Sequence, residues 1–193
     1  MTTITDPITE GLQRGWKVLG GKHGALPERI SCDVAIIGSG AGAGITAELL
    51  TKAGLNVVIV EEGQLKSSSD FKQREPEAYA SLYQENAGRK TKDKGITILQ
   101  GRSVGGTTTV NWTSSFHTPP DTLKHWQERF GLKDYNPEAL EPYFQQAQTR
   151  LNILPWATAP NENNELLRRG AAKLGIKAEV IPRNVKGCYN LGS

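Results

Sequence analysis

The chain has 193 residues, of which 37% are hydrophobic, and its 23 basic and 20 acidic residues give a net charge of +3. This length is enough for one domain, or for one domain and part of another. The charge is small and the basic residues are scattered, which argues against a nucleic-acid partner, and the longest apolar run is far too short to span a membrane.

The first predicted element is a helix within a polar N-terminal leader, residues 1–30. Apolar residues recur there at nearly helical spacing, namely Ile8, Leu12, Trp16 and Leu19. Such a helix can pack on a domain or lie on a membrane surface. We prefer packing, because the polar face carries few cations, and leave peripheral membrane association open.

Two features bear on location. Residues 1–10 lack the basic and apolar regions of a secretory signal. The two cysteines, Cys32 and Cys188, show no metal-ligand spacing, and so low a cysteine content suits a reducing compartment. We therefore expect a cytoplasmic protein with no metal site and with unreactive thiols.

Residues 33–61 have the order of a dinucleotide-binding βαβ unit. An apolar strand at 34–37 leads into a glycine turn at 38–43, a helix, and a second apolar strand at 57–60. This order predicts an α/β fold with a parallel sheet. An ordinary βαβ unit without a ligand is the alternative interpretation.

The glycine turn has the residues that a pyrophosphate site needs. Gly38 allows a tight turn, Gly40 lets the backbone approach a phosphate, and Ala43 keeps the helix close to its strand. Gly42 and Gly44 flank Ala43, so the register can shift by one residue. The phosphates would bind the unpaired N–H groups at the start of the helix.

Glu61 closes the second strand, 21 residues after Gly40 (61 minus 40). A carboxylate at this point accepts hydrogen bonds from both hydroxyls of an adenosine ribose and repels a 2′-phosphate. The sequence therefore predicts FAD or NAD and disfavours NADP.

A second glycine motif follows a polar insertion. The insertion, residues 64–95, is predicted to be a surface excursion with a short helix near 75–84. A short strand is then expected around 96–99, before a segment at 101–111 that contains two adjacent glycines and three threonines. Alone this segment is typical of a turn, but paired with the first motif it indicates a second cofactor contact.

Beyond residue 117 the pattern is mostly helical. Helices are expected around Trp126, over 137–153 and over 165–174, with a short strand at 178–181 and a loop-like tail at 187–193.

These features resemble the N-terminal part of the glucose-methanol-choline (GMC) oxidoreductases, in particular the branch of long-chain alcohol oxidases and bacterial dehydrogenases. The resemblance rests on the stretches 33–63 and 101–112 and on Thr118-Pro119, which leads into the helix containing Trp126. It implies a Rossmann-like FAD-binding domain at 31–116 and, at 117–193, the incomplete beginning of a substrate or cap domain.

The resemblance also implies a set of cofactor residues. In the family the first motif binds the ADP half of FAD, the glutamate holds the ribose, and the second motif lines the pyrophosphate and the flavin. The corresponding residues here are Gly38, Gly40, Ala43, Glu61, Arg102, Val104, Gly105, Gly106, Thr107 and Asn111.

The implied function is FAD-dependent oxidation of the CH–OH group of an alcohol, with hydride transfer to flavin N5. GMC enzymes carry their catalytic histidine in a late segment, so the sequence is expected to be an inactive fragment without catalytic residues. Of His23, His117 and His125, only His117 follows the flavin motif closely, and a loop histidine is the preferred interpretation for it.

Two other functions stay open at this point. One is a module that binds FAD or ADP without catalysis, and the other is an NAD-dependent dehydrogenase, which has no need of the segment 101–111. The motifs specify neither the alcohol nor the electron acceptor.

Overall fold

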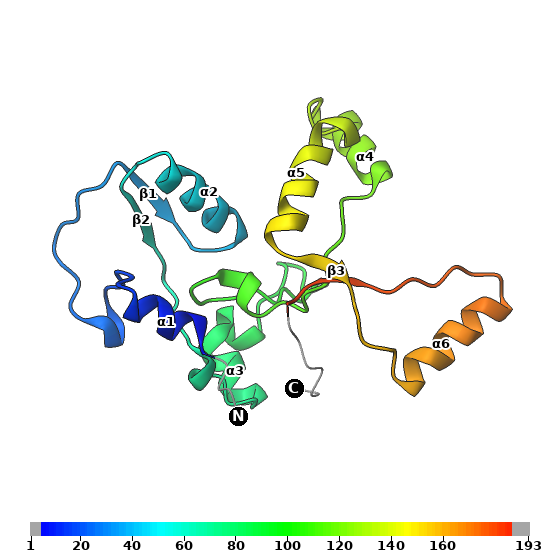
Figure 1. Ribbon diagram of the computed structural model, residues 1–193, viewed down its shortest axis with the longest axis horizontal. Coiled ribbons are helices and arrows are strands. Elements are labelled where there is room, and N and C mark those ends of the chain that lie inside the picture. Colours follow the sequence, from blue (N-terminus) through cyan, green and yellow to red (C-terminus); the bar gives the residue numbers. More distant parts are fainter. Residues whose placement is uncertain (1–4, 187–193) are drawn as a thin grey trace. The chain divides into compact units, whose positions relative to one another are not determined.

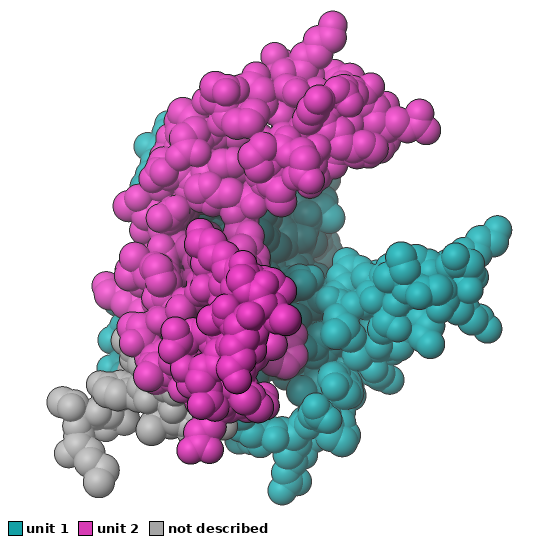
Figure 2. All heavy atoms as spheres, turned by 90° about the vertical axis from the view of Figure 1, so that its right-hand side faces the viewer, with its two compact units in different colours: residues 1–111 teal, residues 112–193 magenta. Residues whose placement is uncertain are grey.

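The computed structural model describes residues 5–186, which form two compact units divided between Asn111 and Trp112 (Figure 2). The predicted tail at 187–193 lies outside the described residues, as does Cys188.

The first unit is built on a parallel pair of strands joined by a helix (Figure 1). Strand β1 (Val34–Ile37) pairs with β2 (Val57–Val60) from Val34↔Val57 to Ile37↔Val60. Helix α2 (Ala41–Lys52) connects them. The predicted βαβ unit is thus confirmed, and both strands consist of the mostly β-branched residues that favour extended backbone.

Few side chains of the described chain are fully enclosed. Ile37 is 82% exposed, and Leu82 and Leu123 are the buried hydrophobic residues among those described. The β1–β2 pair therefore leaves apolar side chains exposed, and such a surface favours packing against other protein segments.

The N-terminal helix α1 (Pro7–Gln13) is shorter than the apolar spacing predicts. Gly15 has a φ of 96°, a left-handed conformation that ends the helix before Trp16. The carboxylate of Asp6 caps α1 by accepting from the Thr9 N–H (2.8 Å), and it also accepts from the Ser68 N–H (2.7 Å). The bond from the Ser68 N–H ties the leader to the insertion.

The insertion and the second glycine motif contain short helices rather than strands. They are η2 (Ser68–Asp70), α3 (Glu75–Leu82), η3 (Gln84–Ala87) and η4 (Gly106–Thr109), and another short helix, η1 (Gly21–His23), precedes β1. The strand expected around 96–99 is wrong. A single isolated bridge, Lys90↔Thr97, lies within these residues and a second, Tyr83↔Gly101, follows them, so the bridges do not continue into a ladder. Ile96 is 64% exposed.

The second unit is mainly helical. Its elements are α4 (Pro120–Phe130), α5 (Pro137–Arg150), β3 (Ile153–Pro155), α6 (Glu162–Lys173) and β4 (Pro182–Asn184). Asn136 caps α5 through the Ala139 N–H (2.8 Å), so the predicted start of that helix is confirmed. The strand expected at 178–181 is wrong, because the antiparallel pairing with β3 begins at Pro155↔Pro182.

Within residues 5–186, no helix has both the length and the apolarity to cross a bilayer.

Candidate functional site

The first glycine motif forms an open turn at the start of α2. Gly38 has a φ of 85°, which allows the tight turn at the end of β1, and its N–H extends the pairing of the strands by donating to the Val60 carbonyl (2.8 Å). Gly40 is the N-cap of α2, so no side chain covers the first N–H groups of the helix. A Cβ built on either glycine meets nothing within 4 Å. The turn therefore has room for an anion beside the helix N-terminus.

Glu61 faces this turn from the end of the neighbouring strand. Its Oε2 accepts from the Ser39 hydroxyl (2.6 Å) and the Ser39 N–H (2.9 Å), and its Oε1 accepts from the Gly63 N–H (2.8 Å). Because Ile37 pairs with Val60 in the parallel register, the C-terminal ends of β1 and β2 lie side by side. Strand pairing thus places the carboxylate beside the glycine turn.

The charge on Glu61 is stabilised by these donors. Partial burial acts to raise the pKa of the carboxyl, but the hydrogen bonds from the Ser39 hydroxyl, the Gly63 N–H and the Ser39 N–H outweigh it. The pKa of Glu61 consequently lies below its usual value of 4.5, and the group is an anion at neutral pH.

This lowered pKa predicts a pH dependence of stability. A carboxyl whose pKa is lower in the folded than in the unfolded state stabilises the fold above the unfolded value and loses that effect as the pH falls through the folded value. We expect the free energy of unfolding of the wild type to exceed that of Glu61→Gln above pH 4.5, and the difference to shrink below it. Urea denaturation of both proteins across this range measures the difference, and a constant difference would contradict the prediction.

The second glycine motif is a loop closed by its own threonines. Thr107 Oγ1 accepts from the Gly101 N–H (3.1 Å), Thr108 Oγ1 donates to the Gly105 carbonyl (2.5 Å), and Thr109 Oγ1 donates to the Val104 carbonyl (2.8 Å). These hydroxyls stabilise the loop from within, a role that was not predicted from the sequence.

The two glycine motifs meet, although Ser39 and Gly105 are 66 residues apart. The Gly105 N–H donates to Ser39 Oγ (2.9 Å). Gly106 lies so close to the turn that a Cβ on it would be 3.2 Å from the Cα of Gly40. The structure thus brings Gly38, Gly40 and Glu61 together with Gly105 and Gly106.

A second contact between the motifs involves residues just after Glu61. Gln64 forms a parallel bridge with Ser103, and its carbonyl accepts from the Val104 N–H (3.1 Å). Ser103 is fully buried against Gly63, and its hydroxyl has no hydrogen-bond partner within residues 5–186. Ser39, Gly63 and Gln64 were not predicted as site residues, although Ser39 and Gly63 lie within the first motif.

The other predicted cofactor residues have different surroundings. Arg102 Nε donates to Glu62 Oε2 (3.1 Å) in an ion pair that is about half exposed on both sides. Val104 and Asn111 are exposed, and Ala43 is half-buried in the first turn of α2.

The histidines of the second unit pack against aromatic rings. His117 stacks on Phe144 with 4.6 Å between ring centroids, and its Nε2 lies 3.3 Å from Gln148 Oε1. His125 meets Phe130 edge-on at 5.9 Å. Across the described part of the chain, no three His, Cys, Asp or Glu residues group as metal ligands would.

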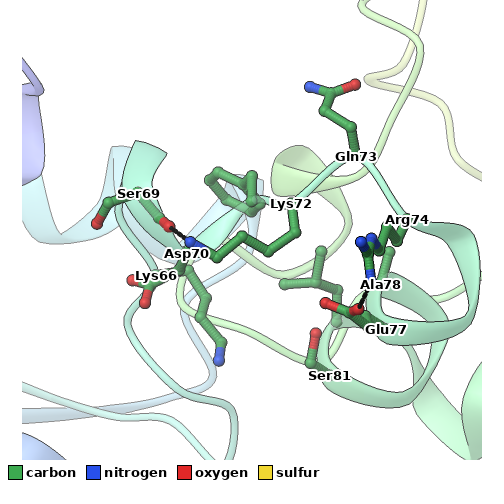
Figure 3. Close-up of a pocket in the computed structure, with 11 residues that line it drawn as sticks. Lys66, Ser69, Asp70, Lys72, Gln73, Arg74, Glu77, Ala78 and Ser81 are labelled. Carbon is green, nitrogen blue, oxygen red and sulfur yellow. Dashed lines mark hydrogen bonds and ion pairs between the residues drawn. The ribbon is translucent and has the colours of Figure 1, made fainter.

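A cavity of about 520 Å³ opens between the 66–74 loop and α3 (Figure 3). Its cations have protein partners: Lys72 Nζ donates to the Ser69 carbonyl (2.7 Å), and Arg74 pairs with Glu77 (3.3 Å). None of the predicted cofactor residues lines it.

Comparison with protein families matches residues 79–193 to the family described as GMC oxidoreductase. Among curated proteins, the chain is similar to a long-chain-alcohol oxidase of Arabidopsis thaliana, with 33% identity over 187 residues that cover 94% of this chain and 24% of that protein. It is also 34% identical to an uncharacterized GMC-type oxidoreductase of Mycobacterium tuberculosis, over 84% of this chain and 26% of that protein. The chain thus spans about a quarter of the length of these relatives.

Among solved structures, the chain resembles an FAD-dependent oxidoreductase from Chaetomium thermophilum with a TM-score of 0.54 and 16% identity. The likeness covers 81% of this chain and 34% of that chain. Together with the parallel β1–β2 pair, it confirms the predicted α/β class.

Proposed function

The chain belongs to the GMC oxidoreductase family, whose members use FAD, and we propose that it holds both ends of FAD for the oxidation of an alcohol. The observation that carries the proposal is the meeting of the two glycine motifs at Ser39–Gly105 and Gly40–Gly106. FAD is a long molecule, so a clamp on its adenylate end must be joined to one near its flavin. Two adjoining glycine loops meet that requirement.

The residues of the turn fit the ADP half of the cofactor. The N-terminus of α2 has no capping side chain, and the space beside Gly38 and Gly40 is open, as a pyrophosphate requires. Glu61 is an anion that is only partly buried, so it can accept hydrogen bonds from ribose hydroxyls and repel a 2′-phosphate.

We assign the cofactor residues accordingly. The first group, for pyrophosphate and ribose, is Gly38, Gly40, Ala43 and Glu61. The second group, for pyrophosphate and flavin, is Arg102, Val104, Gly105, Gly106, Thr107 and Asn111. When bound, FAD would accept a hydride from the alcohol carbon at its N5. An alcohol substrate is supported by the similarity to the long-chain-alcohol oxidase of Arabidopsis thaliana.

We further propose that this chain alone binds FAD without turning over alcohol. His117 stacks on Phe144 with its Nε2 beside Gln148 Oε1, and His125 packs edge-on against Phe130. We therefore assign neither histidine as the base for the alcohol proton. Residues 117–193 would begin the substrate domain. The cytoplasmic location stays a prediction from the sequence.

Adding FAD to the purified protein tests both statements. We expect one FAD per chain after gel filtration, displacement by ADP, and no bleaching of the flavin absorbance by alcohols under anaerobic conditions. Failure to retain flavin would contradict the proposed function, and bleaching would contradict the proposed inactivity. Enhanced NADH fluorescence on binding, without flavin retention, would favour a nicotinamide-dependent dehydrogenase instead.

A further inference from the structure

We propose that Ser39 is a positioning residue that couples the adenylate end of the cofactor site to the flavin end. The inference rests on the proposed function, because the two ends are defined by FAD. The Ser39 hydroxyl donates its one proton to Glu61 Oε2 (2.6 Å) and accepts from the Gly105 N–H (2.9 Å). A serine hydroxyl can do both at once, so one side chain joins the two motifs.

The hydrogen bonds form a continuous chain. The Gly63 N–H orients the Glu61 carboxylate (2.8 Å), the carboxylate orients the Ser39 hydroxyl, and the hydroxyl holds the Gly105 N–H. A hydroxyl that donates to an anion becomes a stronger acceptor, because neighbouring hydrogen bonds polarise one another. The charge that would bind the ribose therefore strengthens the contact that fixes the diglycine.

The spacing of the motifs is set from two sides. The Ser39–Gly105 hydrogen bond draws the second loop toward the turn, and the small size of Gly106 permits the approach, since a Cβ at that position would lie 3.2 Å from the Cα of Gly40. Without the hydroxyl the Gln64–Val104 hydrogen bond still holds the start of the second loop, but the segment at Gly105 loses its anchor to the turn. Displacement of Glu61 would move the Ser39 hydroxyl and so weaken its hydrogen bond with the Gly105 N–H.

Amide exchange of the cofactor-free protein tests the coupling without any ligand. We expect Ser39→Ala to speed exchange of the peptide covering 101–111 by about tenfold, the effect of losing one anchoring hydrogen bond. Ser39→Thr keeps a hydroxyl and should restore protection. Ser69→Ala is the matched control, since the Ser69 hydroxyl pairs with that of Ser67 inside one loop (2.9 Å). Unchanged exchange in Ser39→Ala would overturn the proposal.

Binding of two ligands provides the second test. ADP would reach the first motif and only the pyrophosphate side of the second, whereas FAD would span both motifs, so Ser39→Ala should weaken FAD about tenfold more than it weakens ADP. Equal losses for the two ligands would overturn the coupling. A wild-type protein that binds no FAD would contradict the proposed function, and the exchange experiment would still decide the role of Ser39.

Discussion

Replacing Gly63 with alanine should detach the second glycine motif from the first and abolish FAD retention. A Cβ on Gly63 would lie 2.5 Å from the carbonyl carbon of Arg102 and closer still to the N and Cα of Ser103. Ordinary contacts begin at 3.4 Å, and all three obstacles are backbone atoms, so no side-chain rotation relieves the overlap. The two segments must therefore move apart.

The movement would break the pairing that follows Gly63. The Gln64 carbonyl would lose the Val104 N–H (3.1 Å), and the buried Ser103 would lose the surface against which it packs. Overpacking of this kind costs about 1–3 kcal/mol. We expect a lower free energy of unfolding in urea and no stoichiometric flavin after gel filtration.

Gly170→Ala is the matched control for this substitution. Gly170 lies in α6 with nothing within 4 Å of the added Cβ, and alanine in a helix interior stabilises by about 0.5–1 kcal/mol relative to glycine. Replacing glycine with alanine should thus lower the free energy of unfolding at position 63 and raise it at position 170. Gly63→Ala protein that unfolds at the wild-type urea concentration and keeps its flavin would show that the close approach is unimportant.

The sequence predicted the βαβ unit because its signals are local. The strands 34–37 and 57–60 have the predicted bounds, since an apolar, β-branched run marks each one and the glycine turn sets the start of α2 at Ala41. Local order of this kind depends little on the rest of the fold.

The two strands that were predicted wrongly, at 96–99 and 178–181, show the limit of prediction from local sequence. Residues 96–99 have strand-like composition, but only one isolated bridge, Lys90↔Thr97, forms there. The strand expected at 178–181 lies at Pro182–Asn184 instead, because its position depends on which residues β3 offers as partners. Strand formation needs a partner, and a single sequence does not name one.

The candidate site was predictable in its parts but not in its connections. Both glycine motifs and Glu61 are recognisable from spacing. The roles of Ser39 and Gly63 depend on contacts with Gly105 and Ser103, which are distant in sequence. Periodicity carries no information about such contacts.

Replacing Glu61 with alanine should weaken FAD binding by about 100-fold or more, since hydrogen bonds to a charged group contribute about 1.5–3 kcal/mol each. The variant would lose the acceptor proposed for the ribose hydroxyls. It would also lose the group that holds Ser39 and the Gly63 N–H in place. Isothermal titration with FAD measures the loss.

The charge of Glu61 predicts a second effect, on the choice of nucleotide. A carboxylate beside the ribose repels a 2′-phosphate, so the wild type should prefer ADP to 2′,5′-ADP, and Glu61→Ala should lose that preference. Glu77→Ala is the control, because Glu77 is an exposed carboxylate paired only with Arg74 among the described residues. It should leave the affinity for both nucleotides unchanged. If Glu61→Ala kept the wild-type preference and affinity, the carboxylate would serve only to brace the turn, and the ribose would have to bind elsewhere.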